Sequence, residues 1–230
     1  MSGDSRLPEG VDFPASHSWP VELRCGPVVL RPLRRSDRRV WSQVRERNAA
    51  WNGPWDATPP SGTQRGVASF PEMVRVFDRQ AKQDASLPFA ICFDPAWPAA
   101  ETKPRKLPVA GQLTVSSITW GSAHFAHCGY WVDQALAGKG VVPTALALAT
   151  DYCFQVMGLH RMEVNIRPEN ARSLRVVQKL GLRDEGLRER YLHIDGDWRD
   201  HRSFAVCAED VPEGLLVRYL ANHTPGWRAG

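Results

Sequence analysis

The sequence lacks any long apolar run. No stretch approaches the roughly 18 consecutive apolar residues that a membrane-spanning helix requires. Residues 1–20 also lack the basic segment followed by an apolar run that marks a signal peptide. These two absences predict a soluble, cytoplasmic protein without a membrane partner.

Paired motifs for disulfides and metals are missing as well. The five cysteines are widely spaced and include no CxxC pair, which argues against a disulfide framework and against a zinc site. The histidines in the second half form no HxH or HExxH pattern with further ligands, so no metal is predicted. The residues concerned are Cys25, Cys92, Cys128, Cys153 and Cys207, with His124, His127, His160, His193 and His201.

A large excess of one charge is also absent. The chain has 29 Lys and Arg against 25 Asp and Glu, a net charge of +4. A dedicated nucleic-acid binder concentrates more positive charge on one face, so direct nucleic-acid binding is not expected. The arginines within residues 31–47 leave an accessory RNA-binding role open, although such charge more often forms a solvated helix face.

Length and composition predict one globular domain with short extensions. The chain has 230 residues, of which 43% are hydrophobic and 23% charged, enough for a sizeable core. Residues 1–22 are polar and rich in Pro, Ser and Gly, which predicts an extended arm. We expect the domain to span residues 23–210 and residues 211–230 to form a C-terminal tail.

Apolar periodicity predicts an α/β fold in which strands and helices surround a mixed sheet. Residues 51–62 are rich in helix and strand breakers and are read as a loop. Its Trp51 and Trp55 either wall a pocket or pin the loop to the core. Strands are expected at 26–32, 87–93, 109–120, 125–132, 161–167, 188–194 and 203–208, with a hairpin loop at 94–106. Helices are expected after a candidate N-cap at Ser36 and at 70–84, 143–157 and 170–180.

A glycine turn between an expected strand and helix is the first functional signal. Gly138 and Gly140 let backbone N–H groups approach a ligand, and the helix expected from Pro143 adds unpaired donors and partial positive charge. Such a site suits a pyrophosphate. The glycine spacing fits neither a P-loop nor a dinucleotide-binding fingerprint. Taken alone, the turn also fits an ordinary strand-to-helix connection.

A second block, about 30 residues further on, makes a functional interpretation of the turn more specific. Residues 164–173 read VNIRPENARS, and residues 179–182 read KLGL. Together with the turn, they resemble the GNAT acyltransferase superfamily. Residues 191–201, YLHIDGDWRDH, narrow this to the ribosomal-protein-alanine N-acetyltransferases of the RimJ and RimL type. The resemblance covers most of residues 26–210.

The resemblance implies a mixed, mostly antiparallel central sheet flanked by helices, with acetyl-CoA as co-substrate and no metal. The sequence departs from the pattern at Ala137, where Gln or Arg is usual, at Val142, where Gly or Ala is usual, and at Leu182, where Phe is usual. Backbone donors at the turn remain in place. The implied coenzyme-binding residues are Trp131, Val132, Ala137, Gly138, Lys139, Gly140, Val141, Val142, Asn170 and Ser173.

The resemblance also places catalytic candidates near the thioester. Ser173 has a hydroxyl that suits protonation of the leaving thiolate, although a serine in a first helical turn also serves as a cap. Independently of the resemblance, Glu163 and Asn165 lie two apart on an expected strand and so face one side of it. If that side faces the acceptor, Glu163 is a candidate base; otherwise it is a solvated or ion-paired carboxylate. Glu189 is the weaker alternative, since Arg190 occupies the position where relatives carry an acid.

The implied reaction is transfer of an acetyl group to a primary amine. The resemblance points to the N-terminal α-amine of a protein, specifically a ribosomal protein. Two alternatives stay open: acetylation of a small amine such as a polyamine or an aminoglycoside, and a non-catalytic acyl-CoA-binding module. We expect a monomer or a weak dimer.

Overall fold

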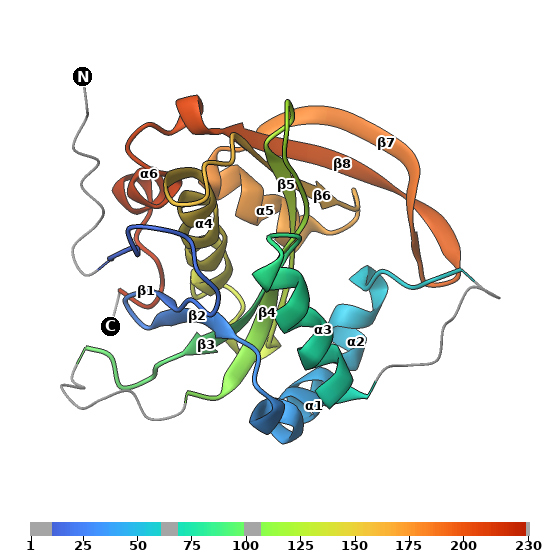
Figure 1. The fold of residues 1–230 in the computed structure, drawn as a ribbon. Coiled ribbons are helices and arrows are strands. Elements are labelled where there is room, and N and C mark those ends of the chain that lie inside the picture. The colour runs from blue at the N-terminus through green and yellow to red at the C-terminus, as the bar shows by residue number, and fades with distance from the viewer. Residues whose placement is uncertain (1–10, 61–68, 99–106, 229–230) are drawn as a thin grey trace.

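The computed structural model describes residues 11–60, 69–98 and 107–228, which form one eight-stranded sheet flanked by helices (Figure 1). Seven neighbouring strand pairs build the sheet in the order β1-β2-β3-β4-β5-β6-β8-β7, and only β5 and β6 run parallel. This confirms the mixed, mostly antiparallel sheet. The strands are β1 Leu23–Cys25, β2 Val28–Pro32, β3 Leu87–Phe93, β4 Val109–Thr119, β5 Phe125–Val132, β6 Arg161–Ile166, β7 Arg183–Ile194 and β8 Asp197–Cys207.

Helices cover both faces of the sheet (Figure 1). Strand β3 is apolar throughout, and β2 is apolar from Val28 to Leu30, because both faces of these strands are buried. In β2, Val28 and Leu30 belong to the larger core with α4, whereas Val29 packs in a smaller cluster with α1 and α3 residues. The helices are α1 Arg38–Arg47, α2 Ala49–Asn52, α3 Phe70–Lys82, α4 Val141–Gln155, α5 Ala171–Leu180 and α6 Leu215–Asn222.

Helix α4 is the central helix of the larger core and is apolar almost all round, as expected for a helix without a solvent face. Its buried Asp151 accepts hydrogen bonds from the backbone N–H groups of Leu215 and Leu216, at 2.6 and 2.9 Å. These bonds cap α6, so the expected C-terminal tail contains a helix docked on the core. Burial raises the pKa of Asp151 to about 6.

The parallel pair of strands opens a wedge in the sheet. Strand β5 pairs with β6 only where Phe125–His127 meets Arg161–Glu163. Beyond this contact the two strands are unpaired with one another, and each leads through a turn into a helix, β5 into α4 and β6 into α5. Both helix N-termini therefore lie at the open end of the wedge.

Several local elements differ from their sequence-based prediction. Helix α1 begins at Arg38, after a 3-10 turn in which Asp37 binds the buried Arg31, and Ser36 is no cap. The expected loop that contains both tryptophans instead begins with α2 and a 3-10 turn, Gly53–Trp55. Strands β7 and β8 are longer than predicted and form a hairpin across the tight turn at residues 195–196.

The described part of the predicted N-terminal arm lies against the core without regular secondary structure. Residues 11–22 contain no helix or strand, and their Val11 and Val21 are buried against the larger core. Residues 1–10 lie outside the described part of the chain, as do parts of the loops predicted at 51–62 and 94–106. Among the described residues, no helix is long and apolar enough to cross a membrane.

Candidate active site

The glycine turn presents a row of backbone donors at the start of α4. Gly138 and Gly140 have φ of +80° and +81°, in the left-handed region that favours glycine. Gly140 is the N-cap, so the helix begins at Val141, two residues before the predicted Pro143. The N–H groups of Gly138, Gly140, Val141 and Val142 donate no hydrogen bond to any described residue. Together with the helix dipole, they form a site for an anion.

The C-terminal residues support this turn from behind. A Cβ on Gly140 would lie 2.7 Å from Pro225 Cβ, closer than side-chain atoms approach, whereas a Cβ on Gly138 would meet nothing within 4 Å. Trp227 Nε1 donates to Thr144 Oγ1 at 3.3 Å. Gly140 is therefore required by packing as well as by backbone conformation, a constraint that the turn sequence alone does not reveal.

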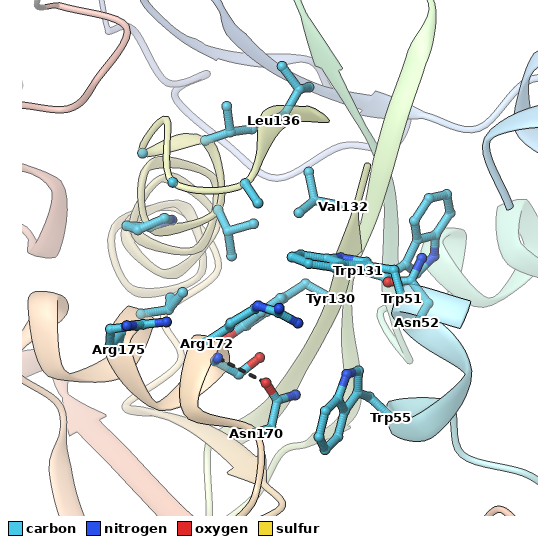
Figure 2. Close-up of a pocket in the computed structure, with 18 of the residues that line it drawn as sticks. Trp51, Asn52, Trp55, Tyr130, Trp131, Val132, Leu136, Asn170, Arg172 and Arg175 are labelled. Atoms are coloured by element: carbon cyan, nitrogen blue, oxygen red, sulfur yellow. Dashed lines mark hydrogen bonds between the residues drawn. The ribbon is translucent and has the colours of Figure 1, made fainter. Parts of the chain in front are cut away.

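A cavity of about 420 Å³ opens in front of the turn (Figure 2). It lies between the turn, α5, the end of β5 and the short helical segment that contains Trp51 and Trp55. Lys139 does not line it. The predicted coenzyme-binding residues that do line it are Trp131, Val132, Ala137, Gly138, Gly140, Val141, Val142, Asn170 and Ser173.

The same cavity is lined by three basic side chains of α5 that the sequence analysis missed. Arg172, Arg175 and Lys179 follow one another at spacings of three and four, so they share a face of the helix. None of them forms an ion pair with a described carboxylate, and all three can therefore balance the charge of a bound phosphate. Their helical spacing was the signal that could have identified them.

The two tryptophans wall the cavity, which decides between the two alternatives. Both line it, and Figure 2 shows them facing the α5 side across the opening. The Arg172 guanidinium lies 3.9 Å from the Trp51 ring centroid, and that of Arg167 lies 5.4 Å from the Trp55 ring centroid. The Arg172 contact links the helical segment to α5, and the Arg167 contact links it to the turn between β6 and α5.

A second cavity of about 340 Å³ continues from the first toward the wedge between β5 and β6. The two cavities share six lining residues and so form one continuous cleft: Trp55, Asp56, Tyr130, Trp131, Asn170 and Ser173. Beyond these shared residues, the polar side chains that line the second cavity are Gln112, Thr114, Ser116, Asn165, Arg167 and His201.

Ser173 lies at the junction of the two cavities. The Asn170 side chain accepts a hydrogen bond from the Ser173 N–H at 3.1 Å and so caps α5, while the Ser173 hydroxyl plays no part in this cap. Burial raises the pKa of the Tyr130 phenol, and the neighbouring Ser173 side chain opposes that rise. The junction thus holds two hydroxyl groups where the two cavities meet.

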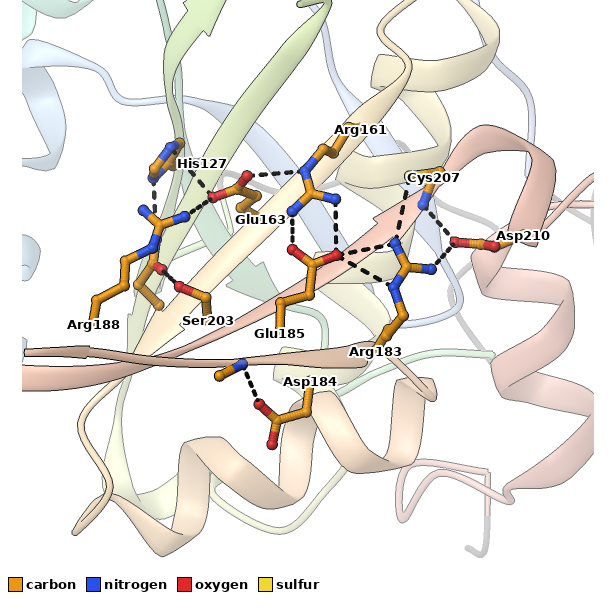
Figure 3. A network of polar contacts seen from close by, with 12 residues as sticks. His127, Arg161, Glu163, Arg183, Asp184, Glu185, Arg188, Ser203, Cys207 and Asp210 are labelled. Carbon is orange, nitrogen blue, oxygen red and sulfur yellow. Dashed lines mark hydrogen bonds and ion pairs between the residues drawn. The ribbon is translucent and has the colours of Figure 1, made fainter.

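The two acidic candidates lie elsewhere. Glu163 is buried, and its carboxylate accepts hydrogen bonds from Arg161 at 2.9 Å and from Arg188 at 3.0 Å (Figure 3). It also faces His127, with 3.7 Å between Oε2 and Nε2. Glu189 is exposed, and neither Glu163 nor Glu189 lines the cleft. Their predicted catalytic roles therefore have no geometric support.

The cleft suits an acyl-coenzyme A. Backbone donors face one end, apolar and aromatic side chains line its wall, and unpaired basic groups lie beside it. These are the features that a pyrophosphate, a pantetheine chain and a further phosphate require. Within the described ranges, no group of three or more His, Cys, Asp or Glu side chains is placed to hold a metal ion.

Comparison with known proteins identifies the family. Residues 28–183 match the Acetyltransferase (GNAT) domain family. The [ribosomal protein uS5]-alanine N-acetyltransferase of Escherichia coli (strain K12) is 35% identical over 202 residues, which cover 84% of this chain and 94% of that protein. The structure of Mycobacterium smegmatis RimJ in complex with CoA-disulfide has a TM-score of 0.76 at 34% identity, covering 88% of this chain and 95% of that one.

Two further relatives show that the likeness extends to proteins with other acceptors and to partial matches. The spermidine N(1)-acetyltransferase of Escherichia coli (strain K12) is 24% identical over 93% of this chain and 95% of its own length. The probable N-acetyltransferase YjcK of Bacillus subtilis (strain 168) is 36% identical over 100 residues, only 44% of this chain and 55% of that protein. With its fold and its coenzyme-sized cleft, the chain belongs to the GNAT acetyltransferase family and is an acetyl-CoA-dependent N-acetyltransferase.

Proposed function

We propose that the acceptor is the N-terminal α-amine of a protein, specifically a ribosomal protein, and that the reaction takes place in the cytoplasm. The observation that carries the proposal is the charge of the second cavity. Asp56 is the one carboxylate among its described lining residues, and it is already ion-paired with Arg45. A polyamine carries several ammonium groups, which such a lining leaves without partners.

A peptide N-terminus carries a single amine and therefore needs fewer charged partners in the cavity than a polyamine does. Its α-amine has a pKa near 7.7–8.0 and a lysine side chain one near 10.4, so the neutral nucleophile is a few hundredfold more available at the α-position at neutral pH. Polar neutral groups such as Gln112, Thr114 and Asn165 suit the hydrogen-bonding needs of a peptide backbone. The relatedness to uS5-alanine N-acetyltransferase supports the same acceptor class.

In this proposal, each of the two cavities binds one of the two substrates. The turn at Gly138–Val142 and the basic face of α5 hold the coenzyme, and the second cavity holds the peptide. The Ser173 hydroxyl, at the junction, passes a proton to the departing thiolate while it takes one from the amine nitrogen. Residues 23–210 form the catalytic unit, in a monomer or a weak dimer, and the segment at Pro225–Trp227 supports its turn.

Mass spectrometry on defined acceptors tests the proposal. Peptides that begin with alanine and contain an internal lysine should be acetylated on the α-amine, and peptides with a bulky first residue should react more slowly. Spermidine serves as the competing acceptor in the same assay. Predominant ε-acetylation, or turnover confined to spermidine, would contradict the α-amine assignment while leaving the acetyltransferase activity in place.

A further inference from the structure

His201 is a buried histidine on β8 that opens into the acceptor cavity. Its residue is only 3% exposed, and it lines the second cavity together with Tyr130, Asn170 and Ser173. The Tyr191 ring contacts its ring edge-on at 5.8 Å between centroids. Burial fixes the side chain in place, yet one edge of it reaches the space where an acceptor amine must approach the thioester.

The hydrogen bonds of His201 determine its tautomer. Nδ1 lies 2.9 Å from the carbonyl oxygen of Arg199, and because a carbonyl oxygen only accepts, Nδ1 carries the hydrogen. In the neutral ring, Nε2 then carries no hydrogen and has a lone pair that can accept one. No described residue donates a hydrogen bond to Nε2. The ring is therefore arranged to accept a proton at the nitrogen that is left for the cavity.

Burial, together with the charge of Arg167, favours the neutral form of His201. Its pKa is lowered, first by burial and also by Arg167, and this outweighs the opposing influence of the Arg199 carbonyl, Glu169 and Asp200. A histidine with a lowered pKa is unprotonated at neutral pH. The remaining ionised group that lines the cavity, Asp56, is paired with Arg45.

We propose that His201 Nε2 is the proton acceptor for the acceptor amine. The substrate enters as an ammonium ion, an N–H bond breaks and an Nε2–H bond forms, and the freed lone pair attacks the thioester carbon. The N–C bond forms, the C–S bond breaks, and the second amine proton reaches sulfur through Ser173. His201 then returns its proton to solvent. The identity of the ammonium ion as a peptide N-terminus rests on the proposed function.

This assignment accounts for the base that the acidic candidates do not supply. Glu163 is held by two guanidinium groups outside the cleft, and Glu189 is exposed outside it. Among the described lining residues of the second cavity, His201 alone combines a lone pair on nitrogen with a position inside the cavity. General-base assistance of this kind contributes about a hundredfold or more to turnover.

The test is the pH dependence of His201→Asn, whose amide N–H can keep the bond to the Arg199 carbonyl. At pH 7 the variant should lose about a hundredfold in kcat/KM toward the alanine peptide, and the loss should shrink toward pH 9, where the α-amine is already deprotonated. Coenzyme A affinity by calorimetry should be unchanged, because His201 does not line the coenzyme cavity. A loss that is equal at pH 7 and pH 9 would overturn the proposal.

Ser203→Ala is the matched control. Ser203 is buried two residues further along β8, lines neither cavity, and donates to Asn165 Oδ1 at 2.6 Å. Any loss in this variant should be independent of pH. Nitrogen NMR of the wild-type imidazole gives a readout without substrate: the Nδ1–H tautomer supports the proposal, and the Nε2–H tautomer contradicts it. If peptides fail and spermidine reacts, the same profile is measured with spermidine, so that the two proposals fail separately.

Discussion

The two ends of the cleft are built in different ways. The proposed coenzyme end is formed largely by backbone N–H groups of one turn and by one face of α5, each of which is continuous in sequence. The acceptor end is formed by side chains from β4, β5, β6, β7 and β8, which only the sheet brings together. In the proposed assignment, the first end recognises a fixed chemical group through local geometry, whereas the second depends on single side chains from several strands.

The largest effect is expected where the two ends meet, in Ser173→Ala. The cap of α5 uses the Ser173 backbone N–H, so the variant removes the hydroxyl and leaves the cap in place. We expect kcat to fall about a hundredfold, with little change in the KM for acetyl-CoA, because general-acid assistance is lost. Single-turnover kinetics measure this directly. An unchanged rate of the chemical step would make Ser173 a structural residue.

A pair of glycine variants tests how the coenzyme end is supported. Gly138→Ala should cost about 1 kcal/mol of unfolding free energy, since the left-handed conformation is strained for alanine. Gly140→Ala adds the overlap with Pro225 and should cost about 2 kcal/mol or more. Urea unfolding measures both. Equal losses in the two variants would mean that the C-terminal segment does not brace the turn.

Most residues that line the proposed coenzyme end could be identified from the sequence because their signals are local. Gly138, Gly140 and Asn170 need a particular backbone conformation or cap, and such needs leave a pattern within a few residues. The mixed sheet followed from the order of apolar segments. The C-terminal segment Pro225–Trp227 has no comparable local pattern, because the turn that it contacts lies far away in the chain. The full length of the β7–β8 hairpin also left no clear local pattern.

The acceptor end was beyond prediction for a physical reason. Glu163 and Asn165 share one face of β6, yet only Asn165 lines the cavity, because β5 still pairs with the strand at Glu163. Near Glu189 the strand register shifts, and Arg190 has φ of +47°, so alternation fails there as well. In the sequence analysis, His201 was considered only as a metal ligand, and no metal pattern was found. Its role depends on a carbonyl two residues away and on a cavity formed by other strands.

The smallest effect on catalysis is expected for Glu163→Gln, which compares the two candidate bases directly. Glutamine keeps the shape and one acceptor oxygen but loses the charge that Arg161 and Arg188 bind, so unfolding free energy should fall by about 1 kcal/mol or more. Because the carboxylate lies outside the cleft, kcat should change by less than about threefold, with an unaltered pH profile. Steady-state kinetics from pH 6 to 9 and urea unfolding measure the two effects on the same preparation. A hundredfold loss confined to low pH, with unchanged stability, would move the base from His201 to Glu163 and would require the ion-paired carboxylate to reach the amine through water.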